Sequence, residues 1–326
     1  MTLCNEKQSA LSDQTGMTLV ELLVALAIGS FLIIGAVQVY NQSRQAFVIN
    51  ESIARVQETA QFAMDTIEAD LRMASNWGLH SRGTAIEGRS LPGDPDPTLL
   101  SPPNLCGQTW AIDLARPVAG NNNVYALPCP ATGTGGPQAN SDTVTTRRAT
   151  VAPTPLTGGR LQIQSTRIQG RLFSNGVIPG GFTAADSETH DLLVNTYYVA
   201  ANSNLIPGVP TLRRKTLVAG GIVDQEVAPG VENMQLQFGV DVDEDNTVDR
   251  YVNPGDPIIT LGDPAFIPGS RVMTARVWLV VRGVTPETGI QDNIVYAPAD
   301  VNLGTFNDQF RRMQVSKTIL LRNART

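Results

Sequence analysis

The stretch Gly16-Met17-Thr18-Leu19-Val20-Glu21 opens an apolar run that continues to Val39. At about 1.5 Å per residue, a helix from Met17 to Val39 is long enough to cross a hydrocarbon core of about 30 Å. Glu21 is the only charged side chain in this run. Because a carboxylate at the centre of a membrane helix costs roughly 2.5–3.5 kcal/mol on insertion scales, the position of Glu21 predicts a partner of opposite charge.

The order of small and apolar residues is the reverse of an ordinary secretory signal. Such a signal places its apolar stretch first and its small-residue cleavage site afterwards. Here Gly16 precedes the apolar run, so that cleavage after Gly16 would remove a polar leader, residues 1–16, and leave the helix on the mature chain. This arrangement resembles the class III signal of type IV prepilins.

In that family a prepilin peptidase cuts after the glycine, the new N-terminus is methylated, and the carboxylate at the fifth mature position guides assembly. The resemblance implies that Gly16 and Met17 are the processing residues and that Glu21 is the assembly residue. A carboxylate in an apolar setting is best neutralised by a cation, which the freed amine of a neighbouring subunit would supply. An uncleaved signal anchor, in which Gly16 and Glu21 have no special role, is the alternative.

Helical periodicity continues beyond the apolar run. Apolar residues recur at spacings of three and four, while charged residues occupy the other faces; the apolar positions are Ile49, Ile53, Val56, Ala60, Ala63, Ile67 and Leu71. No proline interrupts residues 17–77, and Gly78 stands where a C-terminal cap is expected. The sequence therefore predicts one helix over residues 17–77, with residues 17–39 spanning the membrane.

Residues 78–326 are predicted to form one β-rich head. Strand patterns occur at 161–168, 192–200, 211–218, 231–240, 272–281 and 313–321. Apolar and polar residues alternate best in Met234–Val240, which favours an antiparallel sheet with one covered face. Residues 79–143 are rich in proline and glycine and are expected to form an irregular insertion. The predicted fold class is α+β and pilin-like, with the long helix packed on the sheet.

Composition and cysteine usage limit the function. The net charge of −6 gives no sign of nucleic-acid binding. Removal of the leader takes away Cys4 and leaves Cys106 and Cys129, which are expected to form a disulfide in an oxidising compartment; two unpaired buried thiols are the alternative. The two histidines, His80 and His190, belong to no catalytic motif. A structural protein is therefore expected rather than an enzyme.

One acidic segment has the spacing of a calcium loop. Carboxylates stand at relative positions 1, 3, 5 and 9, and a backbone carbonyl is available at position 7; the residues are Asp241, Asp243, Asp245, Asp249 and, for the carbonyl, Thr247. Val252 occupies the place of the usual bidentate glutamate. Calcium is thus the one cofactor that the sequence suggests, and a solvated acidic hairpin tip is the alternative.

The head is similar to the PilW class of minor pilins in residues 192–199, 231–241 and 316–323. The resemblance implies a minor pilin of a type IV pilus that primes assembly or sits at the fibre tip. Its implied partners are other minor and major pilins, the prepilin peptidase and methyltransferase, the inner-membrane assembly platform and, before assembly, membrane lipid. Its implied location is the bacterial inner membrane, crossed once with the head in the periplasm, and then the extracellular pilus.

Two other functions remain open at this stage. The chain could be a large minor pseudopilin of a type II secretion system, which would share the same signal and helix. It could also be a pilus-associated surface adhesin, with residues 79–143 as its contact surface.

Overall fold

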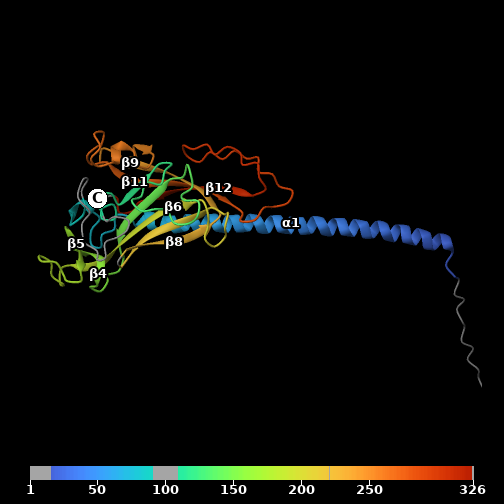
Figure 1. Ribbon diagram of the computed structural model, residues 1–326, viewed down its shortest axis with the longest axis horizontal. Helices are drawn as coiled ribbons and strands as arrows, with labels where there is room; N and C mark the ends of the chain where they lie inside the picture. Colours follow the sequence, from blue (N-terminus) through green and yellow to red (C-terminus); the bar gives the residue numbers. More distant parts are fainter. Residues whose placement is uncertain (1–15, 91–108, 220, 325–326) are drawn as a thin grey trace, which may run out of the picture. The chain divides into compact units, whose positions relative to one another are not determined.

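The structure is a computed structural model that describes residues 16–90, 109–219 and 221–324 (Figure 1). Within these residues it contains one α-helix, α1 (Leu19–Met73), and two 3-10 helices, η1 (Gly83–Ala85) and η2 (Pro257–Ile259). The strands are β1 (Ile86–Glu87), β2 (Val118–Asn121), β3 (Thr143–Ala149), β4 (Gly158–Ser165), β5 (Gly170–Asn175), β6 (Glu188–Ala200), β7 (Thr211–Val218), β8 (Gly221–Pro229), β9 (Val231–Asp241), β10 (Arg250–Val252), β11 (Arg271–Arg282) and β12 (Arg312–Leu320).

The helix α1 ends earlier than the sequence predicts. It stops at Met73 rather than Trp77, because Ser75 adopts the left-handed region with φ of 66°. At this helix end the side-chain amide of Asn323 donates hydrogen bonds to the carbonyl oxygens of Met73 (3.5 Å) and Ala74 (3.3 Å), and the N–H of Asn76 also donates to the Met73 carbonyl (3.2 Å). Trp77 is fully buried in the head instead of continuing the helix.

The chain divides into two compact units, Met1–Ser52 and Ile53–Thr326. In the first unit the apolar side chains of α1 are exposed; Leu19 and Phe31, for example, are 76% and 79% exposed. Among the described residues, α1 is the one helix that is long and apolar enough to cross a membrane. Such a continuous apolar surface needs lipid or protein around it, in agreement with the prediction for residues 17–39.

The second unit contains two sheets. In the larger sheet the order is β1-β5-β4-β6-β3-β2, with β7 paired to β6 and β8 paired to β7. In the smaller sheet the order is β10-β9-β11-β12. Every pairing is antiparallel except that of β1 with β5. The predicted α+β class and the antiparallel head are therefore confirmed.

Two apolar clusters lie on opposite faces of β6, since neighbouring residues of a strand point to opposite sides. Tyr197 and Val199 belong to the cluster that includes the buried face of α1 from Val56 to Leu71. Leu192 and Val194 belong to the other cluster, together with side chains from the segment after α1, namely Trp77, Ile86, Ala111, Ile112 and Leu114. The prediction of one covered face is therefore wrong for the larger sheet. Side chains of the predicted insertion, residues 79–143, cover the second face of the larger sheet.

The packing of α1 on the head includes one buried carboxylate, Asp70. Its oxygens accept hydrogen bonds from the Tyr197 hydroxyl (2.6 Å), the Asn195 amide (2.7 Å) and the Arg148 guanidinium (3.1 Å). Arg148 comes from β3, and the other two come from β6. A buried charge must be paired and hydrogen-bonded, so these three partners fix the rotation of α1 against the sheet.

Asp70→Ala should destabilise the head by about 3 kcal/mol, because it leaves the buried Tyr197 and Asn195 and the half-buried Arg148 without their acceptor. Asp65→Ala, on the exposed side of the same helix, serves as the matched control and should stay within about 0.5 kcal/mol of wild type. Denaturant unfolding of the full chain in detergent measures both values. Equal effects of the two substitutions would contradict the anchoring role of Asp70.

Candidate functional site

The first turn of α1 is closed by three hydrogen bonds that Thr18 and Glu21 make with each other. The backbone N–H and the hydroxyl of Thr18 both donate to Glu21 Oε2 at 2.9 Å, and the Glu21 N–H donates to Thr18 Oγ1 at 3.3 Å. This is the capping-box arrangement, in which the residue before a helix and the third helical residue satisfy each other's free groups. The Glu21 carboxylate therefore has donors within its own chain.

The predicted processing residues lie just outside this cap. Gly16 and Met17 are exposed and precede the first helical residue. Apart from its chain neighbours, no described residue has an atom within 4 Å of the place that a Cβ of Gly16 would take. Cleavage between Gly16 and Met17 would leave the peptide N–H of Thr18 unchanged. The cap on Glu21 can therefore exist both before and after cleavage.

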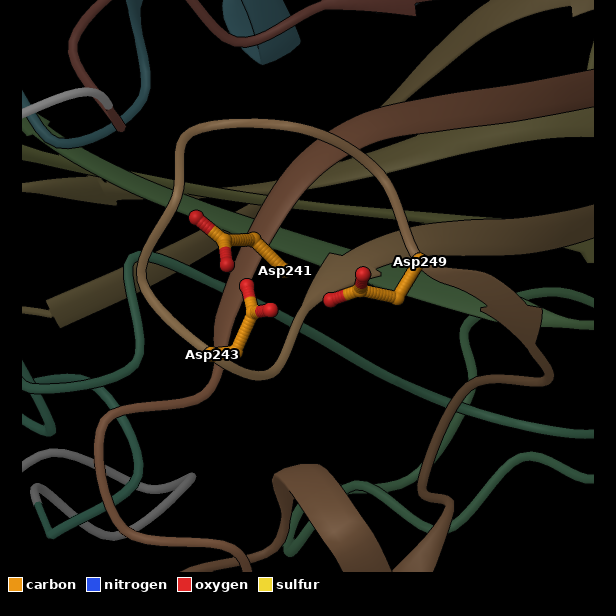
Figure 2. A group of neighbouring side chains, drawn as sticks. All are labelled: Asp241, Asp243 and Asp249. Carbon is orange, nitrogen blue, oxygen red and sulfur yellow. The ribbon is translucent and has the colours of Figure 1, made fainter.

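The second candidate site is the loop between β9 and β10. Side-chain oxygens of Asp241, Asp243 and Asp249 lie within 4.8 Å of one another, and Figure 2 shows the three side chains meeting inside the turn of the loop. Asp245 does not join them, because its Oδ1 accepts hydrogen bonds from the N–H (2.7 Å) and the hydroxyl (2.6 Å) of Thr247. The structure thus brings together three of the four predicted carboxylates.

Asp241, the buried member of the group, already has a cationic partner. Arg271 Nη2 donates to its Oδ2 at 2.9 Å, and the backbone N–H groups of Glu244 (2.7 Å) and Asn246 (2.9 Å) donate to its two oxygens. Burial raises the pKa of Asp241, but these three donors outweigh burial and hold the pKa below its ordinary value. Sequence reasoning missed Arg271, which comes from β11 and carries no local signal.

The loop is stiffened by further local hydrogen bonds. Glu244 and Asn246 adopt left-handed backbone conformations with φ of 67° and 66°, and Asp249 Oδ2 accepts a hydrogen bond from the N–H of Val242 at 2.7 Å. A cation in this loop would have to share Asp241 with Arg271 and Asp249 with a backbone donor. Calcium binding at these residues stays a prediction.

The predicted disulfide involves Cys129, which is buried and whose carbonyl oxygen accepts a hydrogen bond from the Tyr125 hydroxyl at 2.7 Å. Cys106 lies outside the described residues. The pairing of Cys106 with Cys129 stays a prediction.

Two family models match the chain. Residues 196–323 match the family described as type IV pilus-assembly protein W, and residues 11–37 match the prokaryotic N-terminal methylation motif. A methylation motif at the start of a long apolar helix, followed by a β-rich head, defines a type IV pilin-related protein. Within that class the chain is similar to PilW-like minor pilins, which confirms the resemblance seen in the sequence. None of the curated proteins and solved structures compared with the chain matches it.

Arg271→Gln should lower stability at pH 7 by about 2 kcal/mol, because Asp241 loses its charged donor while staying buried. A carboxyl with a lowered pKa stabilises the folded state above its unfolded pKa, near 4, and loses that contribution as the pH falls through the folded pKa. The difference in melting temperature between wild type and variant should therefore shrink from pH 7 to pH 3. Arg250→Gln, which removes an exposed charge on β10, is the control. A difference in melting temperature that does not change with pH would refute the pairing of Arg271 with Asp241.

Proposed function

We propose that the protein is a minor pilin of a type IV pilus, a structural subunit that primes assembly or sits at the fibre tip after cleavage between Gly16 and Met17. The observation that carries the proposal is Glu21, the one charged side chain in the apolar first part of α1, up to Val39, where the large apolar side chains are exposed. Its own chain supplies hydrogen-bond donors from Thr18 but no cation in this turn. A second subunit can supply that cation as a free α-amine.

The match to type IV pilus-assembly protein W favours this function over that of a type II secretion pseudopilin. The partners in this proposal are the prepilin peptidase and methyltransferase, the assembly platform, and other minor and major pilins. Before assembly, lipid covers the apolar part of α1, with the head in the periplasm. The head is large for a repeating shaft subunit and suits a position where few copies pack together.

The test is co-expression with a prepilin peptidase and the cognate pilins, followed by N-terminal sequencing and by analysis of sheared fibres. Wild type should yield methylated Met17 as its first residue and should appear in fibres. Gly16→Leu should keep the leader and stay in the membrane. Glu21→Ala should be cleaved and inserted normally, yet be absent from fibres, because its helix no longer neutralises the neighbouring amine.

Thr18→Val is the matched control for the helix cap. It removes the hydroxyl of Thr18 but keeps the Glu21 charge, so that it should still enter fibres. Fibres that contain the Glu21→Ala variant at the wild-type level would exclude the charge-pairing role. Cleaved protein found only with secretion components, and never with pilins, would favour the pseudopilin. Fibres that form without the protein but no longer attach to surfaces would favour the adhesin.

We also propose that the β9–β10 loop binds Ca²⁺ weakly through Asp243, Asp249 and a shared Asp241. The proximity of their oxygens supports this, since Ca²⁺ takes carboxylate and carbonyl oxygens in flexible geometry. The Arg271 guanidinium competes for Asp241, and the usual twelfth-position glutamate is missing. Both features weaken the affinity.

Saturation with Ca²⁺ at about a hundredfold excess over the dissociation constant should stabilise the full chain by about 2.7 kcal/mol. Asp243→Asn combined with Asp249→Asn should remove the contribution of this loop, whereas Asp263→Asn, which removes one carboxylate from another loop, should not. Arg271→Gln should tighten Ca²⁺ binding because it frees Asp241. Weaker binding in Arg271→Gln would argue against Asp241 as a ligand.

A further inference from the structure

The smaller sheet has an outer face, which does not pack on α1. Neighbouring residues of a strand point to opposite sides, and Leu236, Phe238 and Val277 of β9 and β11 belong to the cluster that includes α1. The residues between them therefore line the outer face, and the pairing of β11 with β9 and β12 arranges them in rows. One row is Gln237, Arg276 and Thr318, and the next is Gln235, Trp278 and Ser316.

Arg276 is held on this outer face by an aromatic ring. Its guanidinium carbon lies 3.6 Å from the centroid of the Tyr251 ring, which is a cation–π contact. Tyr251 comes from β10 and is paired with Gly239 on β9. A Cβ on Gly239 would lie 3.0 Å from Tyr251 Cε1 and 2.2 Å from Thr274 Oγ1, so that a larger residue would push the ring away. The chain thus gives Arg276 a fixed platform.

The guanidinium of Arg276 has no partner of opposite charge among the residues that the structure describes, and none of them forms a hydrogen bond with it. Arg213 and Arg312, by contrast, each pair with at least two carboxylates. A fixed guanidinium with free donors matches a carboxylate, which it can bind through two parallel hydrogen bonds. Arg276 is half-buried rather than enclosed, so a carboxylate from outside the chain can reach it.

Trp278 provides a second aromatic surface on the same face. It is half-buried and stands two residues after Arg276 on β11, which places the two side chains about 7 Å apart along the strand. Their neighbours in the rows are amides and hydroxyls, and Ser316 and Thr318 are exposed. An open sheet face needs only polar residues, whereas tryptophan, tyrosine and arginine are the residues enriched at binding surfaces. The composition of the outer face therefore indicates a ligand.

The chemistry of this face favours a carbohydrate that carries carboxylates. The flat C–H face of a sugar ring can stack on an aromatic side chain, its hydroxyls can exchange hydrogen bonds with amides and hydroxyls, and a carboxylate can pair with the arginine. A protein strand could not add to the middle of this face, because β9 and β11 each lie between two other strands. The single arginine and the net charge of −6 disfavour nucleic acid.

We propose that the outer face of the smaller sheet binds an acidic carbohydrate. Arg276 takes a carboxylate, and Trp278 stacks on the ring of a neighbouring sugar. The sugar hydroxyls pair with the polar side chains of the two rows, namely Gln237, Ser316 and Thr318. Because this face lies on the side of the sheet away from α1, a subunit that packs through α1 can still present it. Binding here would attach the subunit to a polysaccharide, a function separate from assembly.

The experiment uses the full chain in detergent and two probes, tetragalacturonic acid and its methyl ester, which differ in the charge of their carboxyl groups. Binding is followed by the NMR signals of the probe. Wild type should bind the acid at least about tenfold more tightly than the ester. Arg276→Gln should remove this preference. Arg167→Gln, which removes an exposed arginine between β4 and β5, is the matched control and should keep it.

Two further variants separate stacking from charge, and the melting temperature of each shows that it is folded. Trp278→Leu should weaken the binding of both probes by the same factor, because the sugar ring is common to them. Tyr251→Leu should weaken the acid more than the ester, since Arg276 keeps its charge but loses its platform. An unchanged preference in Arg276→Gln, or no binding of either probe to wild type, would overturn the proposal. Equally tight binding of a tetraglutamate peptide would also overturn it and would indicate a surface for acidic protein segments.

Discussion

Asp70 lies on the face of α1 that packs against the head, where a helix would ordinarily carry an apolar residue. Burying a carboxylate is costly unless donors surround it, and Tyr197, Asn195 and Arg148 provide them from two adjacent strands. Because these donors point to one place, α1 can satisfy Asp70 in only one rotation and one axial position. The apolar contacts of the same face, from Val56 to Leu71, would tolerate small rotations or axial shifts of α1, whereas the hydrogen bonds of the Asp70 carboxylate would not.

The position of α1 decides how the rest of the head is built. Once α1 and the smaller sheet cover one face of β6, the other face still exposes Leu192 and Val194, and the chain covers it with residues that follow α1 directly. Arg147 belongs to this second layer, and its guanidinium donates to the carbonyl oxygens of Trp110 and Arg116. A segment with few regular elements is thus held by a buried cation as well as by apolar contacts.

Sequence reasoning found the elements whose pattern is local. The helix was found because its apolar residues keep one period, and β9 was found because apolar and polar residues alternate in Met234–Val240. β3 was missed because both of its faces are buried, so that Thr143–Ala149 shows no alternation and includes two consecutive arginines. β8 was missed because it is a polar edge strand whose Asp224 and Glu226 pair with Arg213 on β7.

The candidate sites divide in the same way. Glu21, Asp243 and Asp249 could be found because motif spacing places them, and Thr18 lies within the same motif. Arg271 could not be found, since it reaches Asp241 across the pairing of β11 with β9. The spacing of residues along the chain predicts the candidate ligands within the β9–β10 loop. It does not predict Arg271, which lies 30 residues after Asp241 and competes with a cation for it.

Under the proposed function, the cap on Glu21 changes how assembly should be understood. A carboxylate without partners would make each subunit costly to keep in the membrane, and its pairing with a second subunit would release that whole cost. Here Thr18 already donates two hydrogen bonds to Glu21, so recruitment exchanges or extends existing partners. The electrostatic free energy of recruitment is then the difference between the interaction of Glu21 with its local cap and its interaction with the amine of a neighbour. This difference is smaller than the full cost of an unpaired carboxylate, so that the pairing is more reversible. A subunit can therefore stay in the membrane before assembly at modest cost in free energy. The large apolar surface of α1, rather than the single charge, supplies most of the free energy of packing. The charge selects the register between subunits.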